Sequence, residues 1–178
     1  MDWSRITPRG VVLLGCGKMG SALLSGWLAR GLLADAVTVI EPNPTDWLRE
    51  TGVGLNTPLP DAPAITLIAV KPQMMQDALP ALRGLQDTLF VTIAAGIPIA
   101  TYEGALGDIR LVRAMPNTPA AVAKGITAII GNGAATAADL DLADQLLAAV
   151  GDVVRLDRED QMDAVTGLSG SGPAYVFH

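Results

Sequence analysis

One segment constrains the fold more than any other: a glycine-rich turn that joins an apolar run to an amphipathic stretch. The run is residues 11–14 and the amphipathic stretch is residues 19–30. At their junction, Gly15, Gly17 and Gly20 form the pattern GxGxxG. In such a turn the first glycine permits the tight bend, the second lets the backbone approach a pyrophosphate, and the third lets helix and strand pack closely. The helix N-terminus that follows attracts the anion, so the segment predicts dinucleotide binding.

Further apolar runs predict the rest of a sheet. Each run is short and unbroken rather than alternating, which is typical of parallel strands covered by helices on both faces. The expected strands are residues 11–14, 37–40, 65–70, 89–94 and 109–112, and the expected crossover helices are residues 19–30, 45–51 and 73–82. This alternation predicts an α/β fold with a doubly wound, mostly parallel, Rossmann-like sheet.

A sixth apolar run and an edge strand extend the predicted sheet at residues 126–130 and 153–156. Between them, Thr136 and Asp139 form a capping-box-like start of a helix, which Gly151 should end.

We expect the dinucleotide-binding domain to span residues 1–157. Residues 158–178 then form a linker and the beginning of an incomplete helical domain. Pro173 suits the first turn of a helix, but residues 174–178 stay apolar and lack a C-cap. Such an end predicts either a helix that docks on a partner or a truncated piece.

Composition excludes several classes of function. A net charge of −6 offers no basic surface for a nucleic-acid backbone, and no apolar run approaches the roughly 20 residues of a membrane span. The single cysteine, Cys16, excludes an internal disulfide and a multi-cysteine zinc site, and it is compatible with a reducing compartment, so the cytoplasm is the default location. The only histidine is the terminal His178, and no P-loop appears, which argues against a Ser-His-Asp hydrolase, a metal site and an NTPase.

Glu41 ends the second expected strand, about 21 residues after Gly20. An acidic side chain there commonly accepts hydrogen bonds from the adenine ribose and favours NAD. The same loop holds Asn43, a potential donor to a 2′-phosphate, and no arginine before Arg49. The choice between NAD and NADP therefore stays open, and Glu41 as a solvated strand end is the alternative.

Two further strand ends should line the same crevice, because cofactors of open α/β sheets lie across the carboxyl ends of the strands. Lys71 could face a phosphate or a ribose, and small residues after the next strand would let a nicotinamide ring approach the backbone. Tight strand-helix packing is the alternative for the small residues. The residues of these two turns are Ala69, Val70, Lys71, Pro72, Ile93, Ala94, Ala95 and Gly96.

Two loops later in the chain carry polar groups. Pro116 and Pro119 fix one loop and leave Asn117, a candidate cofactor-binding residue, as a preorganised hydrogen-bonding group. A rigid turn is the alternative. The Gly/Ser loop over residues 166–173 is a plausible nest for a carboxylate, with a flexible linker as the alternative.

These motifs occur in an order that resembles the pyrroline-5-carboxylate reductase family over nearly the whole chain. They read GCGKMG from residue 15, AVKP from 69, AAG from 94, RAMPNTP from 113 and LSGSGPAY from 168, the last two being the most specific. The resemblance implies hydride transfer from NADPH, or from NADH, to the imine carbon of 1-pyrroline-5-carboxylate, which yields L-proline. No catalytic side chain is assigned, because an iminium carbon is already electrophilic and positioning suffices.

The resemblance also implies site residues. On the cofactor side it implicates Leu14, Gly15, Cys16, Gly17, Lys18, Met19, Asn43, Asn56, Ile93, Ala94, Ala95 and the turn from Ala69 to Pro72. On the substrate side it implicates Glu159, Ser169, Gly170, Ser171 and Gly172, although Glu159 as a simple helix cap is the alternative.

Two departures from the family pattern matter. Many members have asparagine where this chain has Lys18. The family also continues into a helical C-terminal domain that forms a homo-oligomer and completes the substrate pocket, so this chain is expected to be mainly the cofactor half and to need that domain for activity.

Two alternatives stay open. One is a nucleotide-binding or regulatory module without catalysis. The other is a β-hydroxyacid dehydrogenase-like enzyme, which usually carries a catalytic lysine in its interdomain helix; none lies in residues 158–178.

Overall fold

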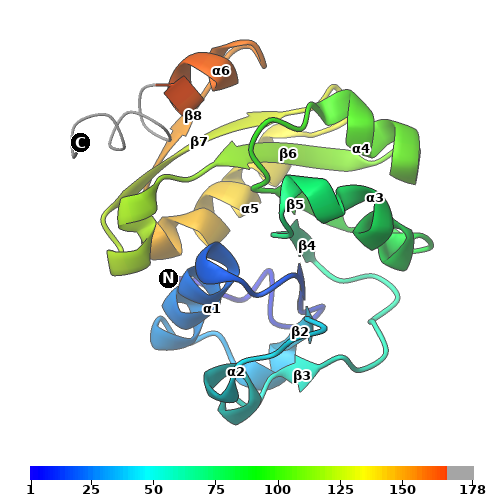
Figure 1. Cartoon of the computed structure of the whole chain (residues 1–178), viewed down its shortest axis with the longest axis vertical. Helices are drawn as coiled ribbons and strands as arrows, with labels where there is room; N and C mark the ends of the chain where they lie inside the picture. The colour runs from blue at the N-terminus through cyan, green and yellow to red at the C-terminus, as the bar shows by residue number, and fades with distance from the viewer. Residues whose placement is uncertain (168–178) are drawn as a thin grey trace.

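The computed structural model describes residues 1–167, which form an eight-stranded sheet in the order β3-β2-β1-β4-β5-β6-β7-β8 (Figure 1). Neighbouring strands pair in parallel except β6 and β7, which are antiparallel. This confirms the doubly wound, mostly parallel, Rossmann-like sheet. The strands are β1 (Val11–Leu14), β2 (Val37–Ile40), β3 (Gly54–Leu55), β4 (Ile65–Ile68), β5 (Leu89–Thr92), β6 (Arg110–Met115), β7 (Gly125–Gly131) and β8 (Gly151–Arg155).

Helices cover both faces of this sheet. Helices α1, α2 and α5 bury side chains in one apolar cluster, and α3 and α4 bury theirs in a second cluster on the opposite face. The α-helices are α1 (Lys18–Ala29), α2 (Asp46–Glu50), α3 (Met75–Ala78), α4 (Ile99–Leu106), α5 (Ala137–Leu147) and α6 (Gln161–Val165). The 3₁₀ turns are η1 (Ala34–Ala36), η2 (Pro72–Met74), η3 (Leu79–Leu82), η4 (Thr118–Val122) and η5 (Ala148–Val150).

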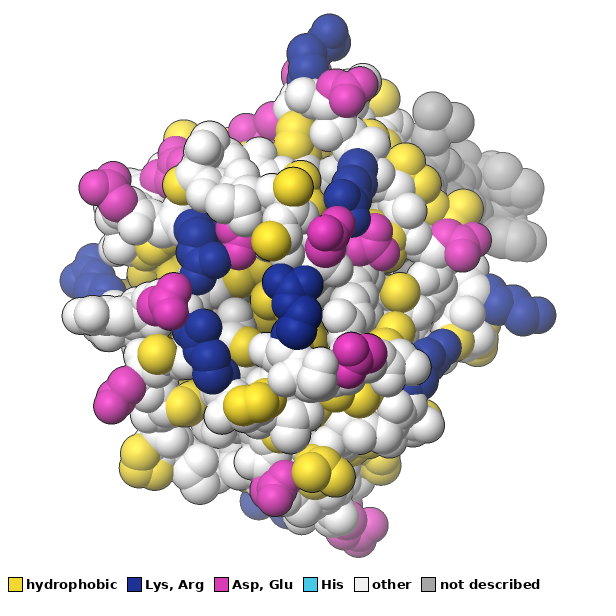
Figure 2. Space-filling view, turned by 180° about the vertical axis from the view of Figure 1, so that it is seen from behind, with side chains coloured by type: hydrophobic (Ala, Val, Ile, Leu, Met, Phe, Trp, Pro, Cys, Tyr) yellow, Lys and Arg dark blue, Asp and Glu magenta, His cyan; other side chains and the backbone are white. Residues whose placement is uncertain are grey.

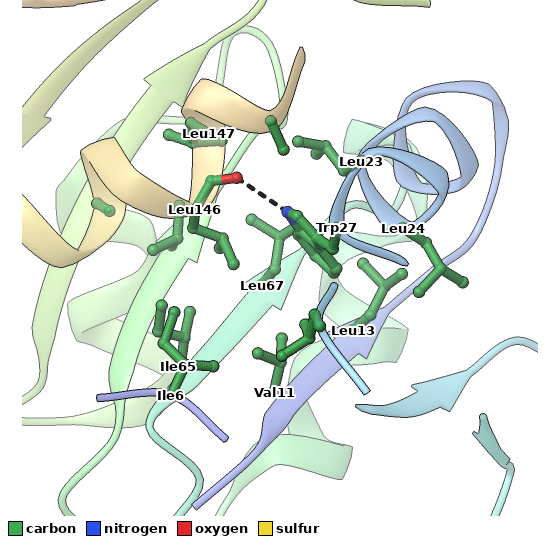
Figure 3. Packing of buried hydrophobic residues seen from close by; sticks show 14 of the residues in the cluster. Ile6, Val11, Leu13, Leu23, Leu24, Trp27, Ile65, Leu67, Leu146 and Leu147 are labelled. Carbon is green, nitrogen blue, oxygen red and sulfur yellow. Dashed lines mark hydrogen bonds between the residues drawn. The ribbon is translucent and has the colours of Figure 1, made fainter. Parts of the chain in front are cut away.

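The unbroken apolar runs supply both clusters at once. Because successive side chains of a strand point to opposite faces, Val11 and Leu13 enter the cluster under α1, whereas Val12 and Leu14 enter the one under α3 and α4. Figure 3 shows the first cluster around Trp27, whose indole Nε1 donates to the backbone oxygen of Leu146 at 2.9 Å. The larger cluster therefore joins α1 and α5 on one face of the sheet.

The structure corrects several predicted boundaries. Strands β4 and β5 end two residues before the expected positions 70 and 94, because the chain turns away from the sheet toward Pro72 and toward Gly96, whose φ is 73°. Strand β6 continues to Met115, beyond the expected residue 112, because its last residues pair with antiparallel β7.

The expected helix over residues 73–82 is broken. It forms η2, α3 and η3 in turn, because Pro80 lies in the first turn of η3 and lacks the amide that a continuous α-helix needs. The two-residue strand β3, helix α4 and the 3₁₀ turns η1, η4 and η5 were not predicted.

Helix α5 and strand β8, the last elements of the sheet region, agree with the predictions from the sequence. Thr136 Oγ1 accepts from the amide of Asp139 at 3.2 Å, and Asp139 Oδ2 accepts from the amide of Thr136 at 2.8 Å, which confirms the capping box of α5. The helix ends at Leu147, before Gly151, and the edge strand β8 is confirmed.

The surface shows both signs of charge. Lys and Arg side chains lie beside Asp and Glu side chains over the face in Figure 2, with hydrophobic side chains scattered between them. Across residues 1–167, none of the helices is long and apolar enough to cross a membrane.

Candidate functional site

A cleft of about 500 Å³ lies at the carboxyl ends of β1, β2 and β4. The chain runs from β1 to β2 and β3 on one side, then crosses to β4 on the other side of β1, so the cleft sits at the topological switch point of the sheet (Figure 1). Ligands of open α/β sheets bind at this point. The lining consists of Leu14, Gly15, Gly17, Ile40, Glu41, Pro42, Asn43, Asn56, Ala69, Val70, Lys71, Met74, Asp77, Ala78 and Ala81.

The three glycines of the turn have separate structural roles. Gly15 has a φ of 88°, and a Cβ there would lie 2.9 Å from Val70 Cγ1. A Cβ on Gly20 would lie 2.6 Å from the backbone oxygen of Gly15, so only glycine lets α1 start this close to β1. A Cβ on Gly17 would meet nothing within 4 Å, so its backbone is open to a ligand. These are the three roles that the sequence motif predicts.

The start of α1 fits an anion. Within the described residues, Gly17 as N-cap gives the helix no side-chain cap, and the first turn holds no acidic residue. Its first amides therefore lack the usual side-chain acceptor, and the helix dipole favours a negative group there. Together with the open face of Gly17, this is the arrangement that a dinucleotide pyrophosphate requires.

Glu41 is held in a fixed position beside the turn. Its Oε2 accepts from the amide of Cys16 and its Oε1 from the amide of Asn43, both at 2.9 Å. Asn56 brackets the Glu41 backbone: its Oδ1 accepts from the Glu41 amide and its Nδ2 donates to the Glu41 oxygen, each at 2.9 Å. Glu41 is therefore an ordered part of the cleft rather than a freely solvated strand end.

The structure brings together eight of the candidate cofactor residues in the cleft lining: Leu14, Gly15, Gly17, Asn43, Asn56, Ala69, Val70 and Lys71. Several lining residues were missed by the sequence reasoning. Four of them share the spacing of one helical face and could have been found by extending the Lys71 turn into the segment that follows: Met74, Asp77, Ala78 and Ala81.

The other candidate cofactor residues lie outside this lining, and contact with a cofactor stays a prediction for all of the candidates. Cys16 is buried in the core beside α1, and Pro72 borders a different hollow next to α3 and α4. Asn117 Oδ1 accepts from the amide of Ile126 at 2.9 Å and so ties the loop after β6 to β7. The remaining ones are Lys18, Met19 and Gly20 in α1, and Ile93, Ala94 and Ala95 after β5.

Glu159 lies at a second, shallower hollow near the ends of β5 and β6. Its Oε1 accepts from Arg113 Nη1 at 2.7 Å and from the amide of Ile99 at 2.9 Å. These contacts fasten the segment before α6 to the start of α4. The substrate-side candidates Ser169, Gly170, Ser171 and Gly172 lie outside the described residues.

Comparisons with known proteins agree with this geometry. A family model described as NADP oxidoreductase, coenzyme F420-dependent, matches residues 10–96. A pyrroline-5-carboxylate reductase of Pseudomonas aeruginosa is 40% identical in an alignment of 182 positions that covers 96% of this chain and 66% of that relative. The chain belongs to the pyrroline-5-carboxylate reductase family.

Solved structures of this family have the same fold. The pyrroline-5-carboxylate reductase of Coxiella burnetii is 30% identical, with a TM-score of 0.87, over 95% of this chain and 66% of that one. The Plasmodium falciparum enzyme, whose structure has NADP bound, is 26% identical with a TM-score of 0.84, over 97% and 66%. The chain thus spans about two thirds of the length of the pyrroline-5-carboxylate reductases that it matches.

Replacing Gly17 with alanine should separate binding from folding. The free energy of unfolding should change by less than about 0.5 kcal/mol, because the added Cβ meets no atom. Dinucleotide affinity should fall at least about tenfold, because the methyl group occupies the approach of the pyrophosphate. Calorimetric titration and urea unfolding measure the two effects.

Gly20→Ala is the matched control for Gly17→Ala. Its Cβ would press on the Gly15 oxygen, so it should lower the free energy of unfolding by about 1–3 kcal/mol. Equal losses of stability in both variants would contradict the separate roles of the two glycines.

Cys16 should behave as an inert thiol. Burial, and next the carboxylate of Glu41, raise the pKa of the Cys16 thiol to about 11, so almost none of it is thiolate at neutral pH. Alkylation of the native chain should therefore be much slower than alkylation of the urea-unfolded chain. The rate of thiol modification under the two conditions measures this, and equally fast modification of the native chain would contradict it.

Proposed function

We propose that the protein reduces 1-pyrroline-5-carboxylate to L-proline with NAD(P)H and that this chain is mainly the cofactor-binding half. In this reaction the bound reduced nicotinamide supplies a hydride to the imine carbon, and the imine nitrogen keeps a proton. The observation that carries the proposal is the cleft at the switch point of the sheet, with an open Gly17 at one end and the fixed Glu41 beside it. Family membership supports the choice of reaction.

The chain's own residues bind and orient the cofactor in this proposal. The amides at the start of α1 hold the pyrophosphate, because they carry no side-chain cap within the described residues. Glu41 accepts from the ribose, and its position is set by Cys16, Asn43 and Asn56. Lys71, in the turn after β4, adds a positive charge to the same cleft.

We place the nicotinamide and the substrate near the ends of β5 and β6. Ile93, Ala94 and Ala95 follow β5 directly, and the small side chains of Ala94 and Ala95 would let a ring approach the backbone. Arg113 and Glu159 border the neighbouring hollow. The Ser169 to Gly172 loop is proposed to hold the substrate carboxylate, on the strength of its Gly/Ser composition.

We further propose a domain boundary near residue 157, supported by the end of β8 at Arg155. A homo-oligomer is proposed on the resemblance to the family alone. A cytoplasmic location is proposed because the single cysteine is unpaired and buried.

The test is cofactor oxidation by the complete gene product with 1-pyrroline-5-carboxylate, followed by loss of reduced-nicotinamide absorbance and by formation of proline. Turnover that depends on both reactants is the expected result. Cofactor binding without turnover would contradict the reductase and favour the non-catalytic nucleotide-binding module.

A further inference from the structure

The carboxylate of Glu41 occupies two backbone donors beside the cleft, one in the glycine turn after β1 and one in the loop after β2. One of its oxygens takes the Cys16 amide and the other takes the Asn43 amide. Each carboxylate oxygen still has a free acceptor site, because each carries two lone pairs. Glu41 can therefore accept hydrogen bonds from ribose hydroxyls. It also leaves neither the Cys16 amide nor the Asn43 amide free to bind an additional phosphate.

We infer that this cleft selects NADH over NADPH and that Glu41 is the residue that determines the choice. The inference rests on the proposed function, which leaves the two cofactors open. NADPH differs from NADH by a phosphate on the adenine ribose, where an acidic residue at the end of the second strand normally meets the 2′-hydroxyl. A phosphate monoester carries about −1.5 to −2 charges at pH 7, so it would face the Glu41 carboxylate with like charge.

Asn56 cannot easily replace Glu41 as a phosphate ligand. Its side-chain oxygen and nitrogen both hold the Glu41 backbone, at 2.9 Å each. Its φ of 51° is in the left-handed region, which asparagine tolerates better than most residues. Asn56 is therefore a positioning residue that keeps Glu41 at the end of β2.

The other charges of the cleft do not offset Glu41. Its lining holds two carboxylates, Glu41 and Asp77, and one cation, Lys71. Lys71 follows β4, and β1 lies between β4 and β2, so its backbone stands about 10 Å across the sheet from the end of β2. Arg49, the next cation after Glu41 in the chain, is not part of the lining. The one cation of the cleft lining therefore stands away from the end of β2, where Glu41 would meet the additional phosphate of NADPH.

Calorimetric titration of the purified chain with NADH and, separately, with NADPH tests the inference. NADH should bind at least about tenfold more tightly, since like charges in close contact oppose the phosphate. Glu41→Gln should remove most of this preference by strengthening NADPH binding, and Glu41→Asp, which keeps the charge, should retain it. Asp77→Asn is the matched control: it removes a carboxylate from the same cleft and should leave the ratio of the two dissociation constants within about twofold.

The possible outcomes separate this inference from the proposed function. Equal affinities, or tighter binding of NADPH by the wild-type chain, would overturn the selection by Glu41 and leave the reductase proposal standing. An equal shift of the ratio in Asp77→Asn would assign the preference to overall charge rather than to Glu41. If the folded chain binds neither cofactor, the proposed cofactor site itself is wrong.

Discussion

Replacing Trp27 with alanine is expected to lower the free energy of unfolding by about 3–5 kcal/mol, the usual range for truncating a buried aromatic side chain. Trp27 is fully buried and lies in the same cluster as Leu13, Leu23 and Leu67 (Figure 3). Alanine would leave a large cavity between α1 and the sheet. It would also remove the indole donor from the Leu146 oxygen, one of the last carbonyls of α5, which have no partner within the helix.

Trp27→Phe is the milder comparison. It keeps a buried aromatic ring but loses the indole N–H and part of the apolar volume, so it should cost less than Trp27→Ala, about 1–3 kcal/mol. Urea unfolding followed by circular dichroism measures both variants. A loss below about 1 kcal/mol for Trp27→Ala would show that the cluster does not depend on this side chain.

Trp27 also affects the site, because α1 carries the glycine turn at its N-terminus. Residues 20, 23, 24 and 27 form the buried face of α1 with the spacing of one helical stripe. Loss of Trp27 should loosen the helix that holds the turn, so dinucleotide affinity should fall together with stability. Gly17→Ala, by contrast, should lower affinity alone.

Much of the sheet could be predicted from the sequence because its inner strands are apolar on both faces and separated by helical segments. The capping box at Thr136 was predictable because it uses only residues three apart. The failures have physical causes. Strand β3 has only two residues, which is too few to show a periodic pattern of apolar residues. The segment around Pro80 has the apolar spacing of a helix, but proline has no backbone N–H to donate to the preceding turn.

The candidate site was predictable where local sequence sets the geometry. The glycine turn specifies its own conformation, so the three roles of Gly15, Gly17 and Gly20 could be assigned in advance. The bracketing of Glu41 by Asn56 could not, because it joins residues 15 apart in sequence through the pairing of β2 and β3.

The two partners of the ion pair between Arg113 and Glu159 differ in their exposure to solvent. The side chain of Arg113 is 8% exposed and that of Glu159 is 35% exposed, with 2.7 Å between Arg113 Nη1 and Glu159 Oε1. A buried charge that loses its partner is strongly destabilising, whereas a partly exposed charge can turn to water. Removing the glutamate should therefore cost more than removing the arginine.

Glu159→Gln is accordingly expected to lower the free energy of unfolding by about 2–3 kcal/mol, somewhat below the range for a fully buried pair because solvent reaches Glu159.

Arg113→Met keeps the length of the side chain and should lower the free energy of unfolding by about 1 kcal/mol or less. The carboxylate of Glu159 is then hydrated and still accepts a hydrogen bond from the Ile99 amide. Urea unfolding of both variants and of the double variant measures the coupling between them. An equal cost for the two single variants would contradict the asymmetry. A rise in substrate KM for Glu159→Gln without any loss of stability would instead support Glu159 as a direct substrate ligand.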